Sequence, residues 1–279
     1  MNILSLFDGM SCGQIALNKL GIKYDNYFAS EIDKYAIKVT QSNYPNTIQL
    51  GDVTKVEGKN LPKIDLLIGG SPCQGFSFAG KQLNFDDPRS KLFFEYVRLK
   101  NELQPKYFLL ENVRMKKEYQ DVISSYLGVE PIEINSSLFV PQNRLRLYWT
   151  NISFPLPEKK HSNLLSDILL NDDFSELTKL KLSENAINYM NRLRNGKQRW
   201  FYHINNINGN AACLTSNMYK GIPYGTIKEK MRRLHPIECE RLQTVPDNYT
   251  NYVSDSQRYK MLGNGWTIDV IAHIFSFIK

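Results

Sequence analysis

The first half of the chain alternates short apolar runs with longer stretches in which apolar residues recur every three or four positions. The short runs predict buried strands and the longer stretches predict helices. The predicted strands are Asn2–Phe7, Tyr27–Ser30, Ile64–Ile68, Tyr107–Glu111 and Leu145–Asn151. The predicted helices are Cys12–Leu20, Lys34–Asn43, Leu92–Glu102 and Asp121–Tyr126. This alternation predicts an α/β fold with a doubly wound, mostly parallel sheet.

The pattern changes at about residue 152, which predicts a second structural unit. Residues 152–231 are polar and rich in Asn, Lys and Arg. Regular patterning then returns: Pro236–Leu242 predicts a short helix opened by proline, and Thr267–Phe277 a terminal helix after a turn at Gly263–Gly265. We therefore expect a larger domain over 1–151, a separate recognition module over 152–231 and a C-terminal segment over 232–279 that returns to the larger domain.

The net charge favours a polyanionic partner. The chain carries 35 Lys and Arg against 28 Asp and Glu, a formal charge of +7, and its pI is near 9.0, which suits nucleic acid. Over Arg192–His203 basic residues stand beside aromatic ones, as phosphate contacts with stacking require, although the exposed end of an amphipathic helix has the same pattern. The candidate nucleic-acid contacts are Arg192, Arg194, Lys197, Arg199, Asn217 and Lys220.

Composition also argues against several protein classes. No apolar run approaches the roughly 18 residues of a membrane span, and the N-terminus lacks the basic start of a signal peptide, so we expect a cytoplasmic protein. A monomer is the default expectation. The four cysteines are Cys12, Cys73, Cys213 and Cys239. They stand at wide spacings without a CxxC pair or a nearby pair of histidines, which predicts reduced thiols and no metal site.

Acidic residues near the ends of three strand-like segments suggest a cofactor that contains adenosine. The first strand ends at Phe7 and the chain turns through Asp8-Gly9, where glycine lets a ligand approach the backbone, although the GxGxxG fingerprint is missing. Glu31 follows about two dozen residues later, where a carboxylate can grip ribose hydroxyls. Asp52 suits an adenine amino group with Val53 packed on the ring, or is simply a turn residue. The missing fingerprint favours S-adenosylmethionine over NAD.

A cysteine and a carboxyl group stand at two further strand ends. Cys73 lies on a sharp turn after a buried strand, which suits a nucleophile, although a thiol that only fills space would fit as well. Glu111 ends another strand, at the edge where open α/β sheets place their sites. Gln142, Arg144 and Arg146 alternate along a predicted strand and so share one face, directed either to an anionic substrate or to solvent.

These motifs, in this order, resemble the cytosine-C5 DNA methyltransferases. The cofactor motifs are Phe7-Asp8-Gly9, Glu31-Ile32-Asp33 and Asp52-Val53, and the catalytic loop is Ser71-Pro72-Cys73-Gln74. The motifs that follow are Arg89–Phe94, Glu111-Asn112-Val113, Gln142–Arg146, Arg233–Pro246 and Gly263-Asn264-Gly265. The resemblance covers about residues 1–150 and 232–279, and residues 152–231 stand where the family has its variable target-recognition region.

The resemblance implies methyl transfer from S-adenosylmethionine to C5 of a cytosine flipped out of a short double-stranded DNA target. The Cys73 thiolate would add to C6 while Glu111 hydrogen-bonds the N3/N4 edge, and nearby arginines would hold the nucleotide and lower the pKa of Cys73. The implied catalytic residues are Cys73, Glu111, Asn112, Gln142, Arg144 and Arg146. The implied cofactor contacts are Phe7, Asp8, Gly9, Glu31, Ile32, Asp52, Val53, Pro72, Leu92, Asn264 and Trp266. The implied DNA contacts in the loop after Cys73 are Gln74, Ser77, Lys81 and Arg89.

Two departures bear on the substrate. Ser5 stands where many bacterial members carry Asp, and Ser5–Gly9 is similar to animal de novo enzymes and some phage enzymes. The tRNA-directed branch usually has a second proline before its cysteine, whereas this chain has Ser71, so we expect DNA as the substrate. The alternatives are a tRNA cytosine methyltransferase and a catalytically silent DNA-binding paralogue. A separately acting restriction endonuclease would be a natural partner.

Overall fold

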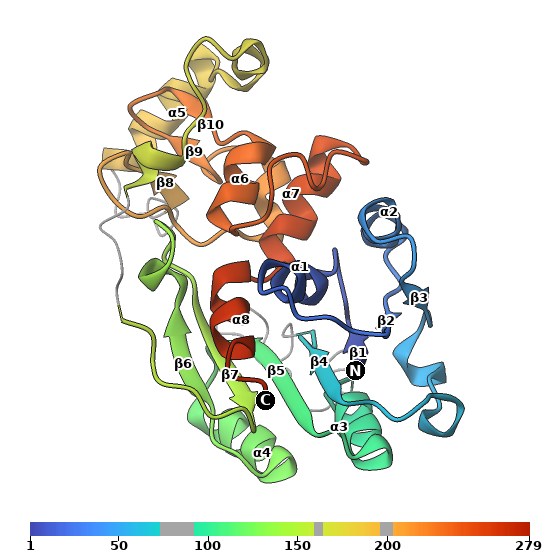
Figure 1. The fold of residues 1–279 in the computed structure, drawn as a ribbon. Helices are drawn as coiled ribbons and strands as arrows, with labels where there is room; N and C mark the ends of the chain where they lie inside the picture. Colours follow the sequence, from blue (N-terminus) through green and yellow to red (C-terminus); the bar gives the residue numbers. More distant parts are fainter. Residues whose placement is uncertain (73–91, 159–163, 196–202) are drawn as a thin grey trace. The chain divides into compact units, whose positions relative to one another are not determined.

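The computed structural model describes residues 1–72, 92–158, 164–195 and 203–279. The chain divides into two compact units (Figure 1). The first unit comprises Met1–Ile134, Leu145–Leu156 and Val270–Lys279. The second comprises Asn135–Arg144 and Pro157–Asp269. Most of the C-terminal segment thus falls in the same unit as the polar middle of the chain.

The first unit is built on a large sheet. Within the described residues its seven strands follow the order β3-β2-β1-β4-β5-β7-β6. The strands are β1 (Asn2–Leu6), β2 (Asn26–Ser30), β3 (Ile48–Gln49), β4 (Leu66–Gly69), β5 (Tyr107–Val113), β6 (Ile132–Asn135) and β7 (Leu145–Thr150). Pairs from β3 through β5 are parallel and β7 runs antiparallel to β5. This order confirms the predicted doubly wound, mostly parallel α/β fold.

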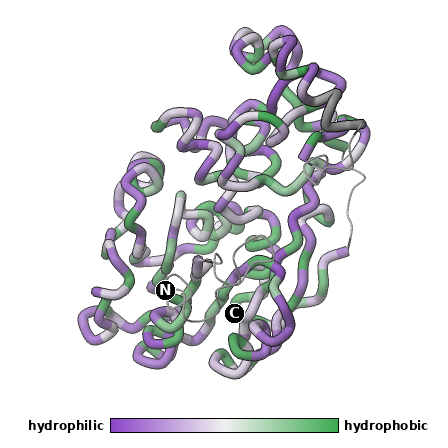
Figure 2. Tube along the Cα trace, turned by 180° about the vertical axis from the view of Figure 1, so that it is seen from behind, coloured by the Kyte–Doolittle hydropathy of each residue, from purple (hydrophilic) through white to green (hydrophobic). Residues whose placement is uncertain are grey.

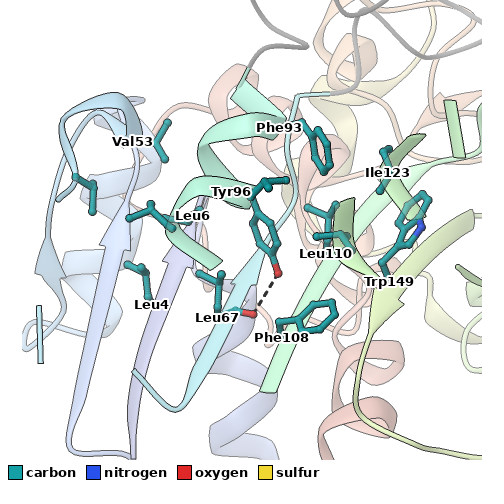
Figure 3. Packing of buried hydrophobic residues seen from close by; sticks show 14 of the residues in the cluster. Leu4, Leu6, Val53, Leu67, Phe93, Tyr96, Phe108, Leu110, Ile123 and Trp149 are labelled. Carbon is teal, nitrogen blue, oxygen red and sulfur yellow. Dashed lines mark hydrogen bonds between the residues drawn. The ribbon is translucent and has the colours of Figure 1, made fainter. Parts of the chain in front are cut away.

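One face of this sheet packs against two amphipathic helices (Figure 3). The helices of the first unit are α1 (Cys12–Lys19), α2 (Lys34–Asn43), α3 (Leu92–Leu103), α4 (Lys117–Leu127) and the later turns of α8 (Ile268–Phe275). Phe93 and Tyr96 of α3 and Ile123 of α4 are completely buried, in the cluster that also holds Trp149. The Tyr96 hydroxyl donates to the Leu67 carbonyl at 3.4 Å, so even the polar end of this ring is satisfied.

Helix α1 packs on the opposite face because its first turn contains a glycine. A Cβ atom on Gly13 would lie 2.3 Å from Cδ1 of Ile68 and 2.7 Å from the hydroxyl of Tyr27. A larger residue fits there only if the ends of these two side chains move. In Figure 2 the helices carry both hydrophobic and hydrophilic positions, as expected for elements that cover a sheet on one side only.

The second unit combines short strands with helices and carries charged groups in its core. Strand β8 (Ile204–Asn205) runs parallel to β9 (Thr226–Ile227), which is antiparallel to β10 (Arg232–Arg233). Its helices are α5 (Glu184–Asn195), α6 (Pro236–Leu242) and α7 (Asp255–Asn264). Its short 3₁₀ turns are η4 (Ser136–Leu138), η5 (Leu165–Ile168), η6 (Ser175–Leu180) and η8 (Ser216–Lys220). Glu238 caps α6 and pairs with Arg232 at 2.7 Å, and both side chains are nearly inaccessible.

Most of the predicted elements form, with three differences. Helix α4 starts at Lys117, one turn before the predicted start. The predicted turn Gly263–Gly265 is largely helical, because α7 runs to Asn264. The prediction that Gln142, Arg144 and Arg146 share one strand face is wrong, since β7 begins only at Leu145. In that part of the chain Gln142 forms an isolated parallel bridge with Ala211, and the side chains of Gln142 and Arg144 donate to distant segments.

Candidate active site

Polar side chains of the first unit follow the carboxyl ends of four neighbouring parallel strands. Asp8 follows β1, Glu31 follows β2, Ser71 follows β4 and Glu111 lies near the end of β5. Because the carboxyl ends of parallel strands meet at one edge of a sheet, these residues share the edge where open α/β folds bind ligands.

The turn after β1 is tight and holds a buried carboxyl group. Phe7, Gly9 and Ser11 have φ values of 57°, 60° and 65°, in the left-handed region. Asp8 is only 8% exposed, and the Tyr27 hydroxyl donates to its Oδ1 atom at 2.8 Å. Burial raises the pKa of Asp8 to about 6. The turn therefore encloses a carboxyl group that holds its proton more tightly than an ordinary aspartate does.

Glu31 connects this turn to the end of β2. Its Oε2 atom accepts from the Gly9 amide at 2.8 Å, and its Oε1 atom from the amides of Ile32 and Asp33 at 2.7 and 2.8 Å. A carboxylate oxygen has a second lone pair, so this fixed group can still accept hydroxyl donors. Ile32, directly beside it, is 77% exposed, which leaves an apolar surface free next to the carboxylate.

Asp52 follows β3, the strand next to β2 in the sheet. The Ser30 hydroxyl donates to the Gly51 carbonyl at 2.7 Å, which joins the two segments. Asp52 caps the short 3₁₀ turn η1 (Val53–Lys55), and hydrogen bonds from Thr54 lower its pKa. Val53, which we expected to pack on an adenine ring, lies in the hydrophobic cluster and is 5% exposed.

These residues fit an adenosine-containing group. Glu31 suits vicinal hydroxyls, Asp52 suits an amino group, and the exposed Ile32 suits a flat ring. The other predicted cofactor contacts in this unit are half-buried: Phe7 and Leu92 pack partly against the core, and Pro72 follows β4. Asn264, exposed, and Trp266, 9% exposed, belong to the second unit.

An ion pair joins β5 and β7 at the same edge. Arg146 stands opposite Val113 in the antiparallel register, so its side chain lies on the face that Glu111 also occupies two residues earlier. The Nε atom of Arg146 lies 3.0 Å from Oε1 of Glu111, and the two side chains are 13% and 10% exposed. This arrangement fixes a carboxyl group and a guanidinium group side by side with limited access to water.

Asn112, one residue after Glu111, points to the segment that leads to Cys73. Its Nδ2 atom donates to the carbonyl and to the hydroxyl of Ser71, at 3.3 and 3.2 Å. Asn112 is 2% exposed and Ser71 4%. The end of β5 therefore fixes the backbone two residues before the predicted nucleophile.

Several predicted site residues lie elsewhere. Gln142 and Arg144 belong to the second unit, are buried, and make the contacts there that are described below. On η8, Asn217 is half-buried and Lys220 exposed. Arg192 and Arg194 lie on α5, but their side chains are outside the described part of the chain. The residues that lie wholly outside it are Cys73, Gln74, Ser77, Lys81, Arg89, Lys197 and Arg199.

Neither a metal site nor a membrane-spanning helix occurs among the described residues. No group of three His, Cys, Asp or Glu side chains is arranged to hold a metal ion in that part of the chain. Nor is any helix within the described ranges long and apolar enough to cross a membrane.

The sequence did not indicate the supporting roles of three residues. Tyr27 donates to Asp8, and Ser71 receives the side chain of Asn112. Arg98 of α3 donates to the carbonyls of Val53 and Val56 at 3.3 and 2.8 Å, which fixes the turn that carries Asp52. None of these has a local sequence signal, because each partner is 19 or more residues away.

Comparison with known proteins agrees with the family resemblance that the sequence motifs indicate. The family described as C-5 cytosine-specific DNA methylase matches residues 1–279. The type II methyltransferase M1.ScrFI of Lactococcus lactis subsp. cremoris is 33% identical over 96% of this chain and 75% of its own length. M.HhaI of Haemophilus parahaemolyticus is 28% identical over 98% of this chain and 93% of its own length. The structure of the Entamoeba histolytica methyltransferase EhMeth has a similar fold, with a TM-score of 0.78 at 18% identity, over 100% of this chain and 99% of that one.

Proposed function

Because the chain belongs to the C-5 cytosine-specific DNA methylase family, we propose that it transfers a methyl group from S-adenosylmethionine to C5 of a cytosine in double-stranded DNA, as a DNA (cytosine-5-)-methyltransferase. The observation that carries the proposal is the ion pair between Glu111 and Arg146, with 3.0 Å between Oε1 and Nε. The residue after Glu111 is Asn112, whose side chain donates to Ser71 in the segment before Cys73. A carboxyl group paired with a guanidinium group, together with the thiol that the sequence supplies, suits attack on a pyrimidine ring.

The proposed chemistry starts from the weakness of C5 as a nucleophile. The Cys73 thiolate forms a bond to C6 of a flipped-out cytosine, the π pair of C5–C6 shifts to C4–C5, and the π pair of C4–N3 shifts to N3, which makes C5 nucleophilic. The carboxyl group of Glu111 hydrogen-bonds the N3/N4 edge, and Arg146 orients that carboxyl group and faces the ring carbonyl. After C5 has gained the methyl group, loss of the C5 proton and release of the thiolate restore the aromatic ring.

S-adenosylmethionine, when bound, would supply an electrophilic methyl group on its sulfonium, and S-adenosylhomocysteine would be left as the product. On the protein side, Glu31 would accept from the ribose hydroxyls, Ile32 would pack on the adenine ring and Asp52 would accept from the adenine amino group. Asp8, at the end of β1, provides negative charge near the cationic part of the ligand. The basic residues of the second unit, Lys220 among them, contact the DNA.

Bisulfite sequencing tests this proposal directly. Purified protein is incubated with S-adenosylmethionine and a plasmid of mixed sequence, and the Cys73→Ser variant serves as the control. We expect protected cytosines in one short motif with the wild-type protein and none with the variant. Absence of protection, together with methyl transfer to tRNA, would instead support a tRNA methyltransferase. DNA binding without transfer to either would support a silent paralogue.

A further inference from the structure

The 3₁₀ turn η8 of the second unit has one buried and one exposed face. Thr215 caps the turn by accepting from the Asn217 amide at 3.3 Å. Met218 is 4% exposed, whereas Tyr219 is 46% exposed with the Lys220 ammonium 6.0 Å from its ring centroid. An aromatic ring, a cation and an amide on one turn are groups that contact bases and phosphates.

Arg144 clamps the entry of this turn to the end of α7. Its Nη1 atom donates to the Leu214 carbonyl at 2.9 Å, and its Nη2 atom to the Gly265 carbonyl at 2.7 Å. Both nitrogens also lie 3.3 Å from the Gly263 carbonyl. Arg144 is 2% exposed, so its guanidinium acts here as an internal bridge between two segments.

Gln142 reinforces the same bridge. Its Oε1 atom accepts from the Leu214 amide at 3.0 Å, and its Nε2 atom donates to the Leu242 carbonyl at 2.6 Å. Gln243 in turn donates to the Leu262 carbonyl at 2.7 Å. The peptide of Leu214 is therefore held on both sides by buried side chains that also hold the ends of α6 and α7.

Direct backbone contact completes the connection. A Cβ atom on Gly263 would lie 2.1 Å from the carbonyl carbon of Thr215 and 2.5 Å from the Ser216 amide nitrogen. These are backbone atoms, so they cannot rotate away as a side chain could. On the far side of the turn, Arg233 donates to the Met218 carbonyl while its guanidinium lies 5.1 Å from the Tyr259 ring centroid on α7.

We propose that Arg144 and Gly263 are positioning residues for target recognition, because they lock the turn Thr215–Lys220 to the end of α7. The locked turn presents Asn217, Tyr219 and Lys220 to the DNA in one fixed register. This inference rests on the proposed function of DNA cytosine methylation. It assigns Arg144 to the discrimination between sequences and makes Tyr219 a further DNA-contacting residue.

Gly263→Ala and Gly209→Ala form a matched pair for the test. A Cβ on Gly209 would meet only the Asn206 carbonyl at 4.0 Å, so this control leaves the packing unchanged. The measurement is kcat/KM on an unmethylated duplex that contains the target motif, divided by kcat/KM on duplexes in which one base of the motif is changed. We call this quotient the discrimination ratio. We expect Gly263→Ala to lower this ratio about tenfold, because a displaced turn loses base contacts, and Gly209→Ala to keep it within about twofold. Equal losses on matched and changed duplexes would overturn the proposal, because they would show a general structural role.

Two further measurements decide the matter even if Gly263→Ala does not fold. In the wild-type protein, the amides of Leu214, Met218 and Gly265 should have similar hydrogen-exchange protection factors, because they open together. Exchange of the first two that is faster by orders of magnitude would contradict the lock. Arg144→Lys, which keeps the charge but loses the forked donor geometry, should raise deuterium uptake over residues 213–220 and lower the discrimination ratio while cofactor affinity stays within about threefold.

Failure of the proposed function gives a different result. A wild-type protein that methylates no duplex refutes DNA methylation and removes the basis of this inference. A wild-type protein that methylates a motif, with discrimination ratios unchanged in folded Gly263→Ala and Arg144→Lys, refutes the positioning role alone.

Discussion

Arg146 and Glu111 form a nearly buried ion pair across β5 and β7, with 3.0 Å between Nε and Oε1. The antiparallel register sets this contact, since Arg146 stands opposite Val113 and thus diagonal to Glu111. A guanidinium held by strand pairing keeps the carboxyl group in one orientation without a ligand present. Such preorganisation lowers the cost of aligning groups with a reacting ring.

Glu111→Gln should slow chemistry far more than it weakens DNA binding. The amide removes the charge that pairs with Arg146 and the carboxyl group that interacts with the ring nitrogen, so we expect a loss of about 100-fold or more in the single-turnover rate. Equilibrium binding of the duplex should stay within about threefold. Glu118→Gln is the control, because Glu118 is 62% exposed in a surface pair with Lys116. Parallel losses of rate and affinity would mean that Glu111 is a binding residue.

Cys73→Ser should abolish turnover and leave cofactor binding nearly intact. At neutral pH a serine hydroxyl cannot replace a thiolate in addition to C6. Methyl transfer from labelled S-adenosylmethionine measures the first effect, and titration calorimetry with the cofactor product measures the second. An active serine variant would contradict the covalent mechanism.

The site residues that can be predicted from the sequence are those whose place depends only on their position at the end of a strand. Glu31 and Glu111 are predictable because a residue at the carboxyl end of a parallel strand reaches the ligand edge whatever the rest of the fold does. The role of Arg144 is not, because its acceptors Leu214 and Gly263 are 70 and 119 residues away. The sequence did not predict helix α7 for a similar reason. Gly263 signals a turn when only its neighbours in sequence are considered, but in the structure it is a helical residue that must be glycine because the backbone of Thr215 packs against it.

Asn112→Ala should reduce kcat and stability together while the KM for the cofactor changes little. The substitution leaves the buried hydroxyl and carbonyl of Ser71 without the donor that they share, at a cost of about 1–3 kcal/mol. The segment before Cys73 then loses its fixed position. Steady-state kinetics and urea unfolding measure the two effects. A stable variant with normal kcat would show that this contact does not position the nucleophile.

Ile32→Ser should weaken cofactor binding without a loss of stability. Ile32 is 77% exposed in the cofactor-free protein, so its side chain contributes little to the free energy of unfolding. An adenine ring packed on it would bury the side chain and would gain the corresponding hydrophobic free energy on binding. We expect an affinity loss of about tenfold and an unchanged melting temperature in the absence of cofactor. Leu156→Ser is the matched control, since Leu156 is 66% exposed in the same unit. Equal affinities for both variants would place the adenine ring elsewhere.

Asp8 should make the stability of the cofactor-free protein depend on pH between about 4 and 6. Burial raises its folded pKa to about 6 from a reference value of 3.8, so the folded state binds a proton that the unfolded state releases in this window. Stability contributed by this group is therefore present at the acidic end and declines as the pH rises toward 6. Asp8→Asn does not titrate and should gain stability relative to wild type over the same range, by up to about 3 kcal/mol at pH 7.

Urea unfolding of both proteins from pH 4.5 to 7.5 measures this difference. Asp52→Asn is the control, because the pKa of Asp52 is lowered by hydrogen bonds from Thr54, and its contribution is lost only as the pH falls below the unfolded value. Across the measured range the difference between Asp52→Asn and wild type should stay constant. If Asp8→Asn also showed a constant difference, Asp8 would keep the same charge in the folded and unfolded states, and its burial at the end of β1 would have no effect on its ionisation.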